Sequence, residues 1–351
     1  MPHAREMTAV YYDEFGKTPV LSRLPIPSIE PTSVLVQVKA SGICRSDWHG
    51  WMGHDRDIQL PHVPGHEFAG IISAVGSEVK GWNIGQRVTT PFVQACGKCD
   101  YCLQQDHQVC EFQEQAGFSS WGSFAQYVEV KNAMVNLVEL PNDMDFATAA
   151  VLGCRFGTAY RALRDQAKIR ETDYLLVIGC GGVGLSSIMI AQALGVHVAA
   201  MDLNPEARKL AGKCGAAITL NSLDEKGKKE ILAWSGKGVH ACVDAIGVKD
   251  LLGECIGLLR RRGRYVQVGL LPDQMGVPSF SFERVVAHEL EVIGSHGIQA
   301  WQYRNMLDFI RLHKLPIHKI ITGTCTLHQS IGLLTTMPEV KTPGVKVILQ
   351  K

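Results

Sequence analysis

The chain has 351 residues, which is long for a single hydrophobic core, so two domains are expected. Hydrophobic residues make up 46% of the chain and charged residues 20%, as in ordinary globular proteins, and the formal net charge is +1. The sequence has no long run of Lys and Arg, and its one short basic cluster, residues 260–262, is expected at the exposed end of a helix. A nucleic-acid partner is therefore not expected.

Eleven cysteines are present, and the first residues lack the apolar stretch of a secretory signal. In such a chain the cysteines are expected to be metal ligands or buried thiols rather than disulfides. This pattern favours a reducing compartment, and the cytoplasm is the expected location.

The first part of the chain, up to about residue 150, has the pattern of a β-rich domain. Short runs that alternate apolar and polar residues, interrupted by prolines, occupy residues 7–40. Further strands are predicted at residues 68–75, 85–89, 124–130 and 133–137. Because helix signals are few, this part is predicted to fold as a barrel-like β domain.

From about residue 145 the pattern changes to strands that alternate with helices. Helices are predicted at residues 146–152, 157–167, 183–194, 205–214 and 251–259, and strands at residues 174–178, 197–201, 217–220, 241–245, 265–268 and 291–294. This alternation predicts a parallel, doubly wound sheet. A helix at residues 301–313 and a strand at residues 344–349 are predicted to follow.

Residues 174–201 contain no Asp, Glu, Lys or Arg and are long enough to span a bilayer. Four glycines cluster within this segment, between β-branched runs. A buried strand–turn–helix–strand explains this composition better than a membrane helix. No membrane association is therefore expected.

Four cysteines with short spacing form a strong local signal. They follow the pattern Cys96-x2-Cys99-x2-Cys102-x7-Cys110. Four thiolates can surround one tetrahedral Zn²⁺ and leave no position for substrate, so such a site would fold its loop. An iron–sulfur cluster, which four cysteines can also hold, is the alternative.

A second set of candidate ligands is dispersed along the chain and consists of Cys44, His66 and Cys154. Two thiolates and an imidazole are the ligand set of an open, catalytic zinc site, which leaves a fourth position for water or substrate. A zinc ion in such a site is a Lewis acid that lowers the pKa of a bound water molecule or hydroxyl group.

The sequence Gly179-Cys180-Gly181-Gly182-Val183-Gly184 follows a predicted strand and opens a predicted helix, and Asp202 lies 18 residues beyond its last glycine. This is the context that the dinucleotide fingerprint requires, with the helix N-terminus facing the pyrophosphate. Asp202 is expected to bind the ribose 2′-hydroxyl, which favours NAD over NADP. Arg208, a basic residue shortly afterwards, complicates this preference.

These motifs resemble the zinc-dependent medium-chain alcohol dehydrogenase family, and the segment Gly42-Ile43-Cys44-Arg45-Ser46-Asp47-Trp48-His49 carries much of the resemblance. The resemblance extends from about residue 9 to residue 348. It implies that the four-cysteine lobe holds a structural zinc, so that each chain carries two zinc ions.

The resemblance also implies roles for two carboxylates near the dispersed ligands. Asp47 is expected to accept a hydrogen bond from His66, with a plain turn residue as the alternative. Glu67 is expected to lie behind the metal, where it can coordinate transiently, with a salt-bridge partner as the alternative.

Ser46 and His49 are expected, by the same resemblance, to carry the proton released from the alcohol out to solvent, with the cofactor ribose between them. An ordinary loop histidine is the alternative for His49. Two further histidines nearby, His54 and His62, are expected at the surface without a role.

Further candidates line the predicted cofactor and substrate positions. Arg45 and Lys346 are candidate partners of the cofactor pyrophosphate. By resemblance, Arg208 is expected near the adenosine ribose, as in NAD enzymes of the family. Trp48, Trp51 and Phe92 are candidate walls of an apolar substrate pocket, with core packing as the alternative for each.

The implied activity is reversible hydride transfer between a primary or secondary alcohol and NAD⁺, which yields an aldehyde or ketone. One alternative is a polyol or amino-alcohol (threonine-type) dehydrogenase of the same family, although many polyol relatives have Glu where Cys154 stands. Another is a non-enzymatic NAD- or zinc-binding protein, which would be expected to have lost Ser46, His49 or Cys154.

The expected architecture is a GroES-like, β-rich, zinc-binding catalytic domain (residues 1–155 and 296–351) and a Rossmann-type NAD-binding domain (residues 156–295). The substrate is expected to be a small alcohol, aldehyde or ketone. By resemblance, the chain is expected to assemble as a homotetramer or homodimer.

Overall fold

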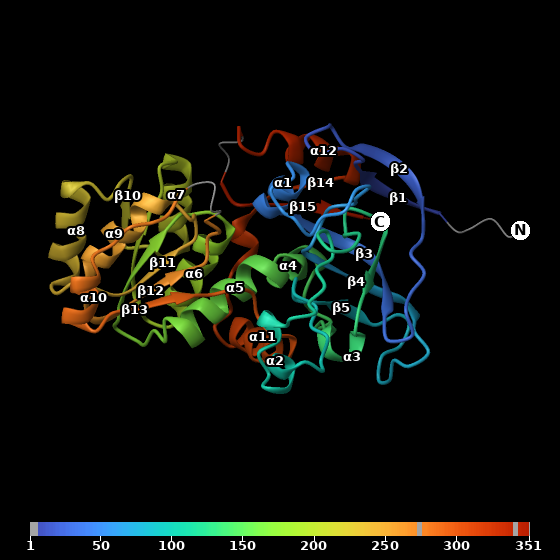
Figure 1. Ribbon diagram of the computed structural model, residues 1–351, viewed down its shortest axis with the longest axis horizontal. Helices are drawn as coiled ribbons and strands as arrows, with labels where there is room; N and C mark the ends of the chain where they lie inside the picture. Colours follow the sequence, from blue (N-terminus) through green and yellow to red (C-terminus); the bar gives the residue numbers. More distant parts are fainter. Residues whose placement is uncertain (1–5, 272–275, 340–342, 351) are drawn as a thin grey trace, which may run out of the picture.

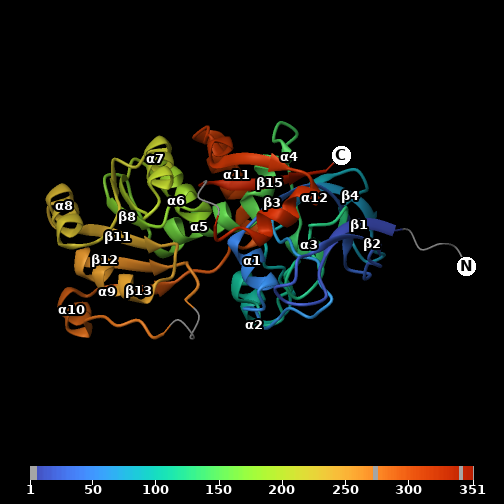
Figure 2. The same cartoon turned by 90° about the horizontal axis from the view of Figure 1, so that it is seen from above.

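The protein is described here by a computed structural model that covers residues 6–271, 276–339 and 343–350. A mostly antiparallel sheet lies at one end of the molecule and a parallel sheet with its helices at the other (Figure 1, Figure 2). The mixed α/β architecture agrees with the fold class predicted from the sequence.

The first sheet is built around the long strand β3 (Val34–Ile43), which is buried along most of its length. Its order is β14-β15-β3-β4-β5-β7, and β6 also pairs with β3. The other strands are β4 (Phe68–Val75), β5 (Arg87–Thr89), β6 (Tyr127–Val130), β7 (Val138–Glu139), β14 (Ile321–Cys325) and β15 (Val345–Leu349). Strands β1 (Glu6–Tyr11) and β2 (Val20–Pro25) form a separate antiparallel pair. Strands from both ends of the chain thus meet at β3.

The second sheet contains six parallel strands in the order β10-β9-β8-β11-β12-β13. Its strands are β8 (Tyr174–Ile178), β9 (His197–Met201), β10 (Ile218–Leu220), β11 (Val239–Asp244), β12 (Leu259–Gln267) and β13 (Glu291–Gly294). Its helices are α6 (Gly182–Ala193), α7 (Pro205–Cys214), α8 (Glu225–Ser235), α9 (Lys249–Leu258) and α10 (Phe282–His288). Strands β9 and β10 are added on one side of β8, and β11 to β13 on the other, so the strand order switches between β8 and β11. Open parallel sheets bind ligands at such a switch point.

Alternate residues of β8 pack into two different hydrophobic cores, one on each face of the sheet. Leu175 and Val177 pack with α6 and α7, whereas Leu176 and Ile178 pack with α8 and α9. Because both faces of the strand are covered, β8 is apolar throughout, as strands of buried parallel sheets are. Helix α6 is also apolar on nearly every side and is buried from Gly184 to Ala191. The charge-free stretch therefore belongs to the core, and no helix in the described part of the chain is long and apolar enough to cross a membrane.

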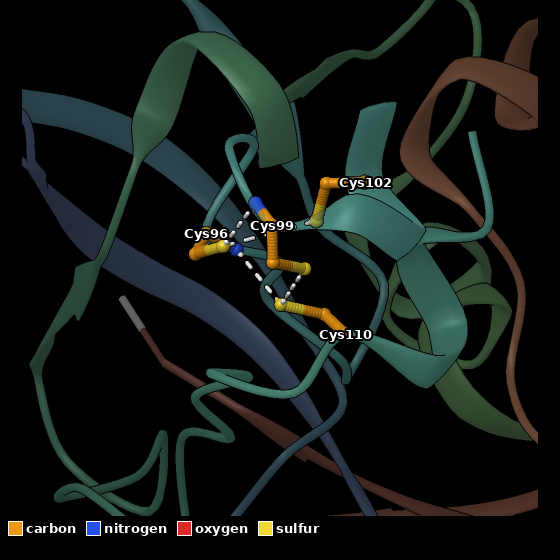
Figure 3. Close-up of side chains that lie close together, drawn as sticks. All are labelled: Cys96, Cys99, Cys102 and Cys110. Carbon is orange, nitrogen blue, oxygen red and sulfur yellow. Dashed lines mark hydrogen bonds between the residues drawn. The ribbon is translucent and has the colours of Figure 1, made fainter. Parts of the chain in front are cut away.

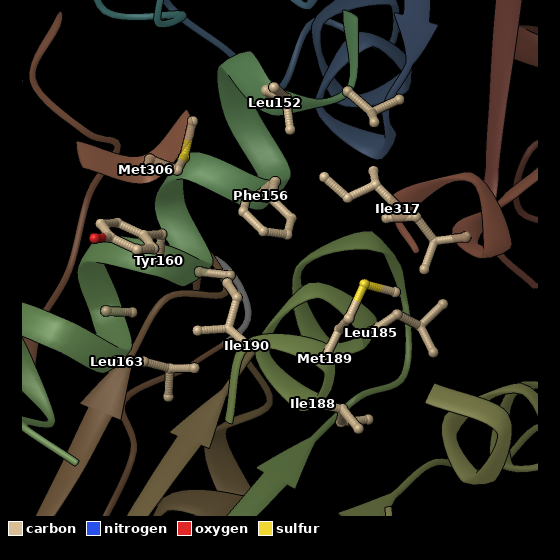
Figure 4. Packing of buried hydrophobic residues seen from close by; sticks show 14 of the residues in the cluster. Leu152, Phe156, Tyr160, Leu163, Leu185, Ile188, Met189, Ile190, Met306 and Ile317 are labelled. Atoms are coloured by element: carbon tan, nitrogen blue, oxygen red, sulfur yellow. The ribbon is translucent and has the colours of Figure 1, made fainter. Parts of the chain in front are cut away.

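A continuous helical segment connects the two sheets. It consists of α4 (Phe146–Ala150), the π-helical turn η2 (Leu152–Phe156), α5 (Gly157–Arg161) and a second π-helical turn, η3 (Ala162–Gln166). Its apolar side chains pack against α6 and against α11 (Tyr303–Leu312) in one hydrophobic cluster (Figure 4). This cluster joins the segment that carries Cys154 to the glycine-rich end of α6.

Shorter elements complete the described chain and position the loops. The helices are α1 (Arg45–Trp51), α2 (Asp100–Leu103), α3 (Ala133–Asn136) and α12 (Leu327–Thr335), and the 3₁₀ turns are His107–Val109, Ala300–Gln302 and Ile317–Ile320.

Three local predictions were wrong. Residues 133–136 form a helical turn rather than a strand, because the Asn136 side chain bonds to the backbone of Ala95 and Lys131 and ties this turn to the cysteine loop. The basic cluster 260–262 begins strand β12 rather than ending a helix. His62, expected at the surface, is only 2% exposed because it packs edge-on against Tyr12.

Candidate active site

Three distant parts of the chain bring Cys44, His66 and Cys154 together. Cys44 stands between β3 and α1, His66 lies just before β4, and Cys154 lies in η2. Their ligand atoms, together with a carboxylate oxygen of Glu67, all lie within 4.8 Å of one another. A π-helical turn is often found at functional sites, and here it carries Cys154. The group has the size and chemistry of a metal site with two sulfur ligands and one nitrogen ligand.

Asp47 orients the His66 ring. Its Oδ1 lies 2.9 Å from His66 Nδ1 and 3.1 Å from the backbone N of Gly65, while its Oδ2 accepts from the backbone N of Cys44 at 2.8 Å. The other ring nitrogen of His66, Nε2, is buried and has no hydrogen-bond partner in the described part of the chain. A buried nitrogen lone pair without a donor, held by a carboxylate on the opposite side of the ring, is the arrangement of a metal-ligating histidine.

The two thiols differ in acidity. A hydrogen bond from Cys154, assisted by the positive charge of Arg155, holds the pKa of Cys44 well below its usual value. The same hydrogen bond, together with burial, raises the pKa of Cys154. Cys44 is thus ready to ligate a cation as the thiolate, and metal binding would release the proton that Cys154 holds. Ser46 Oγ lies 3.6 Å from Cys44 Sγ, at the edge of the same group.

Glu67 forms a buried ion pair with Arg155, a residue that sequence reasoning missed. Glu67 Oε2 lies 2.9 Å from Arg155 Nη2, and its Oε1 accepts from the Arg155 backbone N at 3.1 Å. Burial raises the pKa of Glu67 to about 7, against the opposing effect of the Arg155 charge. A single arginine in the otherwise uncharged stretch 146–160 was the available sequence signal.

His49 lies at the outer side of the site and pairs with His54. Their Nδ1 atoms are 3.0 Å apart, and the Trp48 ring packs edge-on against both imidazoles. His54 is exposed, as expected, but this contact to His49 was not foreseen. Trp51 instead lies in a buried cluster with Tyr12 and Leu334.

Aromatic rings surround the imidazole of His66. Phe92, a predicted pocket residue, lies edge-on with ring centroids 6.2 Å apart, and Phe118 lies closer, at 5.2 Å. The ring of His296 in turn packs at 90° against Phe92, with centroids 5.1 Å apart. Phe118 and His296 were missed because nothing in their local sequence distinguishes them from core residues.

The glycine-rich loop runs from the end of β8 into α6. A Cβ at Gly184 would overlap the carbonyl oxygen of Gly179, so close packing of the turn excludes a side chain there. A Cβ at Gly182 would overlap the Arg155 side chain. Gly181 is the N-cap of α6, and Gly182 and Val183 are its first residues, so their backbone N–H groups point out of the helix N-terminus.

Asp202, at the end of β9, faces this loop. Its Oδ2 accepts from the backbone N of Cys180 at 2.7 Å and its Oδ1 from the backbone N of Asn204 at 2.8 Å. Arg208 donates to the carbonyl oxygens of Asp202 and Leu203. The carboxylate therefore stands beside the glycine turn.

Three basic residues approach the end of β3. Arg45 is the exposed first residue of α1, and Lys346 on β15 lies opposite Ile43 across the two strands. Arg155 donates to the carbonyl oxygen of Ile43. Lys346 Nζ also donates to the backbone oxygen of Thr322 at 3.1 Å.

The four cysteines of the loop form a second compact group (Figure 3). Cys96 Sγ lies 3.9 Å from Cys102 Sγ, and Cys99 Sγ lies 3.7 Å from Cys110 Sγ. A tetrahedron with metal–sulfur bonds of about 2.3 Å has edges of about 3.8 Å. Backbone N–H groups of Cys96 and Cys99 point at sulfur atoms of the group, which favours thiolates. The geometry fits one tetrahedral metal ion.

Comparison with known proteins identifies two matching domains. Residues 30–142 match the alcohol dehydrogenase GroES-like domain, and residues 182–311 match the zinc-binding dehydrogenase domain. The chain is 34% identical to an alcohol dehydrogenase of Geobacillus stearothermophilus over 98% of this chain and 99% of that protein. It is 29% identical to an NAD-dependent alcohol dehydrogenase of Sulfurisphaera tokodaii over 98% of this chain and 100% of that protein.

Among solved structures, a cobalt- and zinc-bound thermostable alcohol dehydrogenase from Pyrobaculum aerophilum superposes with a TM-score of 0.82 at 25% identity. The match covers 99% of this chain and 100% of that one. The likeness extends over both sheets and the segment that joins them.

Proposed function

The chain belongs to the zinc-dependent medium-chain alcohol dehydrogenase family, and we propose that it transfers hydride reversibly between a primary or secondary alcohol and NAD⁺. Oxidation of the alcohol carbon gives an aldehyde or ketone and NADH, and the hydroxyl proton leaves to solvent. The observation that carries the proposal is the group formed by Cys44, His66 and Cys154, with the unpartnered Nε2 of His66 turned away from Asp47.

These three residues would hold the catalytic zinc, which supplies a Lewis acid that makes the alcohol proton easier to remove. Asp47 keeps the Nδ1 proton on His66 and leaves Nε2 as the donor atom. Ser46, beside Cys44, would accept the alcohol proton, and His49 would pass it to solvent.

The contact of His49 with His54 extends this route to an exposed side chain. The pKa of His49 is lowered by burial and by the nearby charges of His54 and Arg45, so the ring is neutral near pH 7. A neutral imidazole can accept a proton from inside the site and release it outside.

The dinucleotide would lie across the glycine-rich loop. The first N–H groups of α6 would receive the pyrophosphate, and Arg45 and Lys346 would add positive charge from the neighbouring strand ends. Asp202, with Arg208 beside it, would bind the adenosine ribose and disfavour a 2′-phosphate.

We infer two zinc ions per chain, because two separate ligand groups are present among the described residues. We also infer a catalytic domain of residues 1–155 and 296–351 and an NAD-binding domain of residues 156–295. The pairing of β15 with β3 and the parallel sheet between β8 and β13 support this division.

The substrate pocket would include Phe92 and Phe118, whose rings flank His66, with Trp48 toward the outside. Trp51, in its buried cluster with Tyr12 and Leu334, would pack in the core rather than line this pocket. An aromatic lining favours apolar alcohols over polyols.

The eleven free cysteines support a cytoplasmic location. The family resemblance implies a homotetramer or homodimer, and exposed apolar residues on α10 and β13, such as Val286 and Val292, are consistent with such an assembly.

The test is NADH formation measured across short, branched, aromatic and polyhydric alcohols. We expect the enzyme to have its highest kcat/KM with an apolar primary or secondary alcohol. A clear preference for polyols or for threonine would favour the alternative dehydrogenases, and lack of turnover with every alcohol in a zinc-loaded sample would contradict the proposal.

A further inference from the structure

Arg155 is a buried charge directly beside the candidate metal site. It follows Cys154 in η2, and its side chain is only 5% exposed. A buried charge without a partner destabilises a protein by several kcal/mol, so such a side chain is retained only where it is paired. Arg155 is paired with Glu67 and with the carbonyl oxygen of Ile43.

Arg155 engages both oxygens of the Glu67 carboxylate. Its Nη2 lies 2.9 Å from Oε2, and its backbone N donates to Oε1 at 3.1 Å. On the other side the carboxylate fills the space above Gly42, where a Cβ would overlap Oε2. Glu67 is thus held from two sides by groups that do not belong to the metal site.

Glu67 could otherwise compete for the metal. One of its carboxylate oxygens lies within 4.8 Å of the ligand atoms of Cys44, His66 and Cys154. Carboxylates are ordinary zinc ligands, and a fourth protein ligand would convert an open catalytic site into a closed one. The charge balance also indicates a role for Arg155. Two thiolates and one carboxylate exceed the charge of a divalent ion by one, and the positive charge of Arg155 neutralises this excess.

We propose that Arg155 is a positioning residue that keeps Glu67 off the metal and thereby keeps the fourth coordination position open. This inference rests on the proposed metal site. Because a Cβ at Gly182 would overlap the Arg155 side chain, the same arginine also joins the metal-site carboxylate to the first turn of α6. Arg155 acts through Glu67 and is not itself expected to touch the substrate.

The experiment uses the full chain loaded with Co²⁺ and measures its visible absorption while imidazole is added as a small ligand for an open position. The four-cysteine site is closed and should not respond. Wild type should bind imidazole. In Arg155→Met, Glu67 should enter the coordination sphere, change the cobalt spectrum before any addition, and weaken imidazole binding about ten- to a hundredfold.

The double variant Arg155→Met/Glu67→Gln should regain imidazole binding, because the competing carboxylate is gone. Arg161→Met is the matched control, since Arg161 is another buried arginine of the same helical segment but contacts Ser295. Arg155→Lys keeps the positive charge but replaces the planar guanidinium group with a single ammonium group, and it should weaken imidazole binding about threefold. This variant decides the question if Arg155→Met does not fold.

An unchanged imidazole affinity in Arg155→Met, or in Arg155→Lys where only that variant folds, would overturn the proposal. So would a double variant that stays as weak as Arg155→Met. Failure of the proposed metal site itself looks different, because wild type would then show no imidazole-sensitive cobalt absorption.

Discussion

At the scale of single residues, the proposed proton carrier His49 shows how burial adjusts the pKa of a side chain. Its pKa is lowered first by burial and then by the charges of His54 and Arg45. A lowered pKa means that the ring is neutral at pH 7 and becomes protonated only below the ordinary histidine value of about 6.5. If His49 accepts the proton in alcohol oxidation, as proposed, it should lose this function as pH falls through that lowered pKa.

Replacing His49 with Gln should therefore slow alcohol oxidation at neutral pH by about tenfold, less than the loss of a group that contacts the substrate directly. Added buffer base should partly restore the rate, because it can take the proton that His49 would carry. Rate profiles over pH for the variant and wild type test this. A loss of equal size at every pH, insensitive to buffer, would assign His49 a packing role instead.

Asp202 should set the cofactor preference. Asp202→Ser removes a negative charge that would face a 2′-phosphate, and it also removes the expected ribose hydrogen bonds. Because a hydrogen bond to a charged group contributes roughly 1.5–3 kcal/mol, NAD affinity should fall about ten- to a hundredfold while NADP use rises.

The carboxylate also accepts two backbone N–H groups of the loop, so Asp202→Asn is the control that keeps an acceptor and removes the charge. The readout is kcat/KM with both cofactors in each variant. A wild type that already prefers NADP would show that Asp202 does not face the ribose.

At the scale of elements, the turn between β8 and α6 depends on the absence of side chains. Gly184→Ala would place a Cβ against the backbone oxygen of Gly179, which cannot move away as a flexible side chain could. The turn should open and NADH affinity should fall by at least about tenfold. Gly212→Ala is a suitable control, because a Cβ on this glycine of α7 meets nothing within 4 Å. Calorimetric titration with NADH compares the two, and equal affinity would show that the turn does not form the cofactor site.

Elements with a strong local signal could be predicted, and those that depend on distant contacts could not. The alternation of β8, α6 and β9 is encoded in apolar runs and glycines, and the Asn204-Pro205 start of α7 is a local capping signal that the structure confirms. Residues 133–136 are a short apolar run, which periodicity cannot assign to strand or helix. Their conformation is decided by the Asn136 contacts to the cysteine loop.

The same distinction applies to the site. Cys96 to Cys110 and the glycine motif each lie within one short segment, so spacing alone could single them out as candidates. Arg155, Phe118 and His296 acquire their surroundings only when η2, the loop before β6 and the chain after β13 meet around His66. Contacts between segments that are distant in the sequence cannot be predicted from the pattern of neighbouring residues.

At the scale of the whole molecule, the four-cysteine lobe contacts residues that lie beside the proposed substrate pocket. The carbonyl oxygen of Gln108 lies 3.2 Å from His296 Nδ1, and that of Gln105 accepts from the Trp301 indole at 3.0 Å. His296 in turn packs against Phe92. The lobe is therefore connected to the proposed substrate pocket without contributing a ligand to the candidate metal site.

Cys99→Ser should lower the zinc content from two ions to one, reduce the thermal midpoint by several degrees, and raise KM more than it lowers kcat. The reason is that the lobe loosens while Cys44, His66 and Cys154 remain. Elemental analysis and thermal melts check this. Iron instead of zinc in the wild-type protein, or an unchanged metal content in the variant, would contradict the assignment of the lobe.

The central claim is that Cys44, His66 and Cys154 hold the catalytic metal and that the dinucleotide binds independently at α6. The most direct measurement is on His66→Ala, in which zinc content, NADH affinity and alcohol oxidation are determined on one preparation. We expect one zinc ion fewer per chain, turnover below detection, and NADH binding within about twofold of wild type. Near-native turnover in His66→Ala would place the catalytic metal elsewhere and contradict the account.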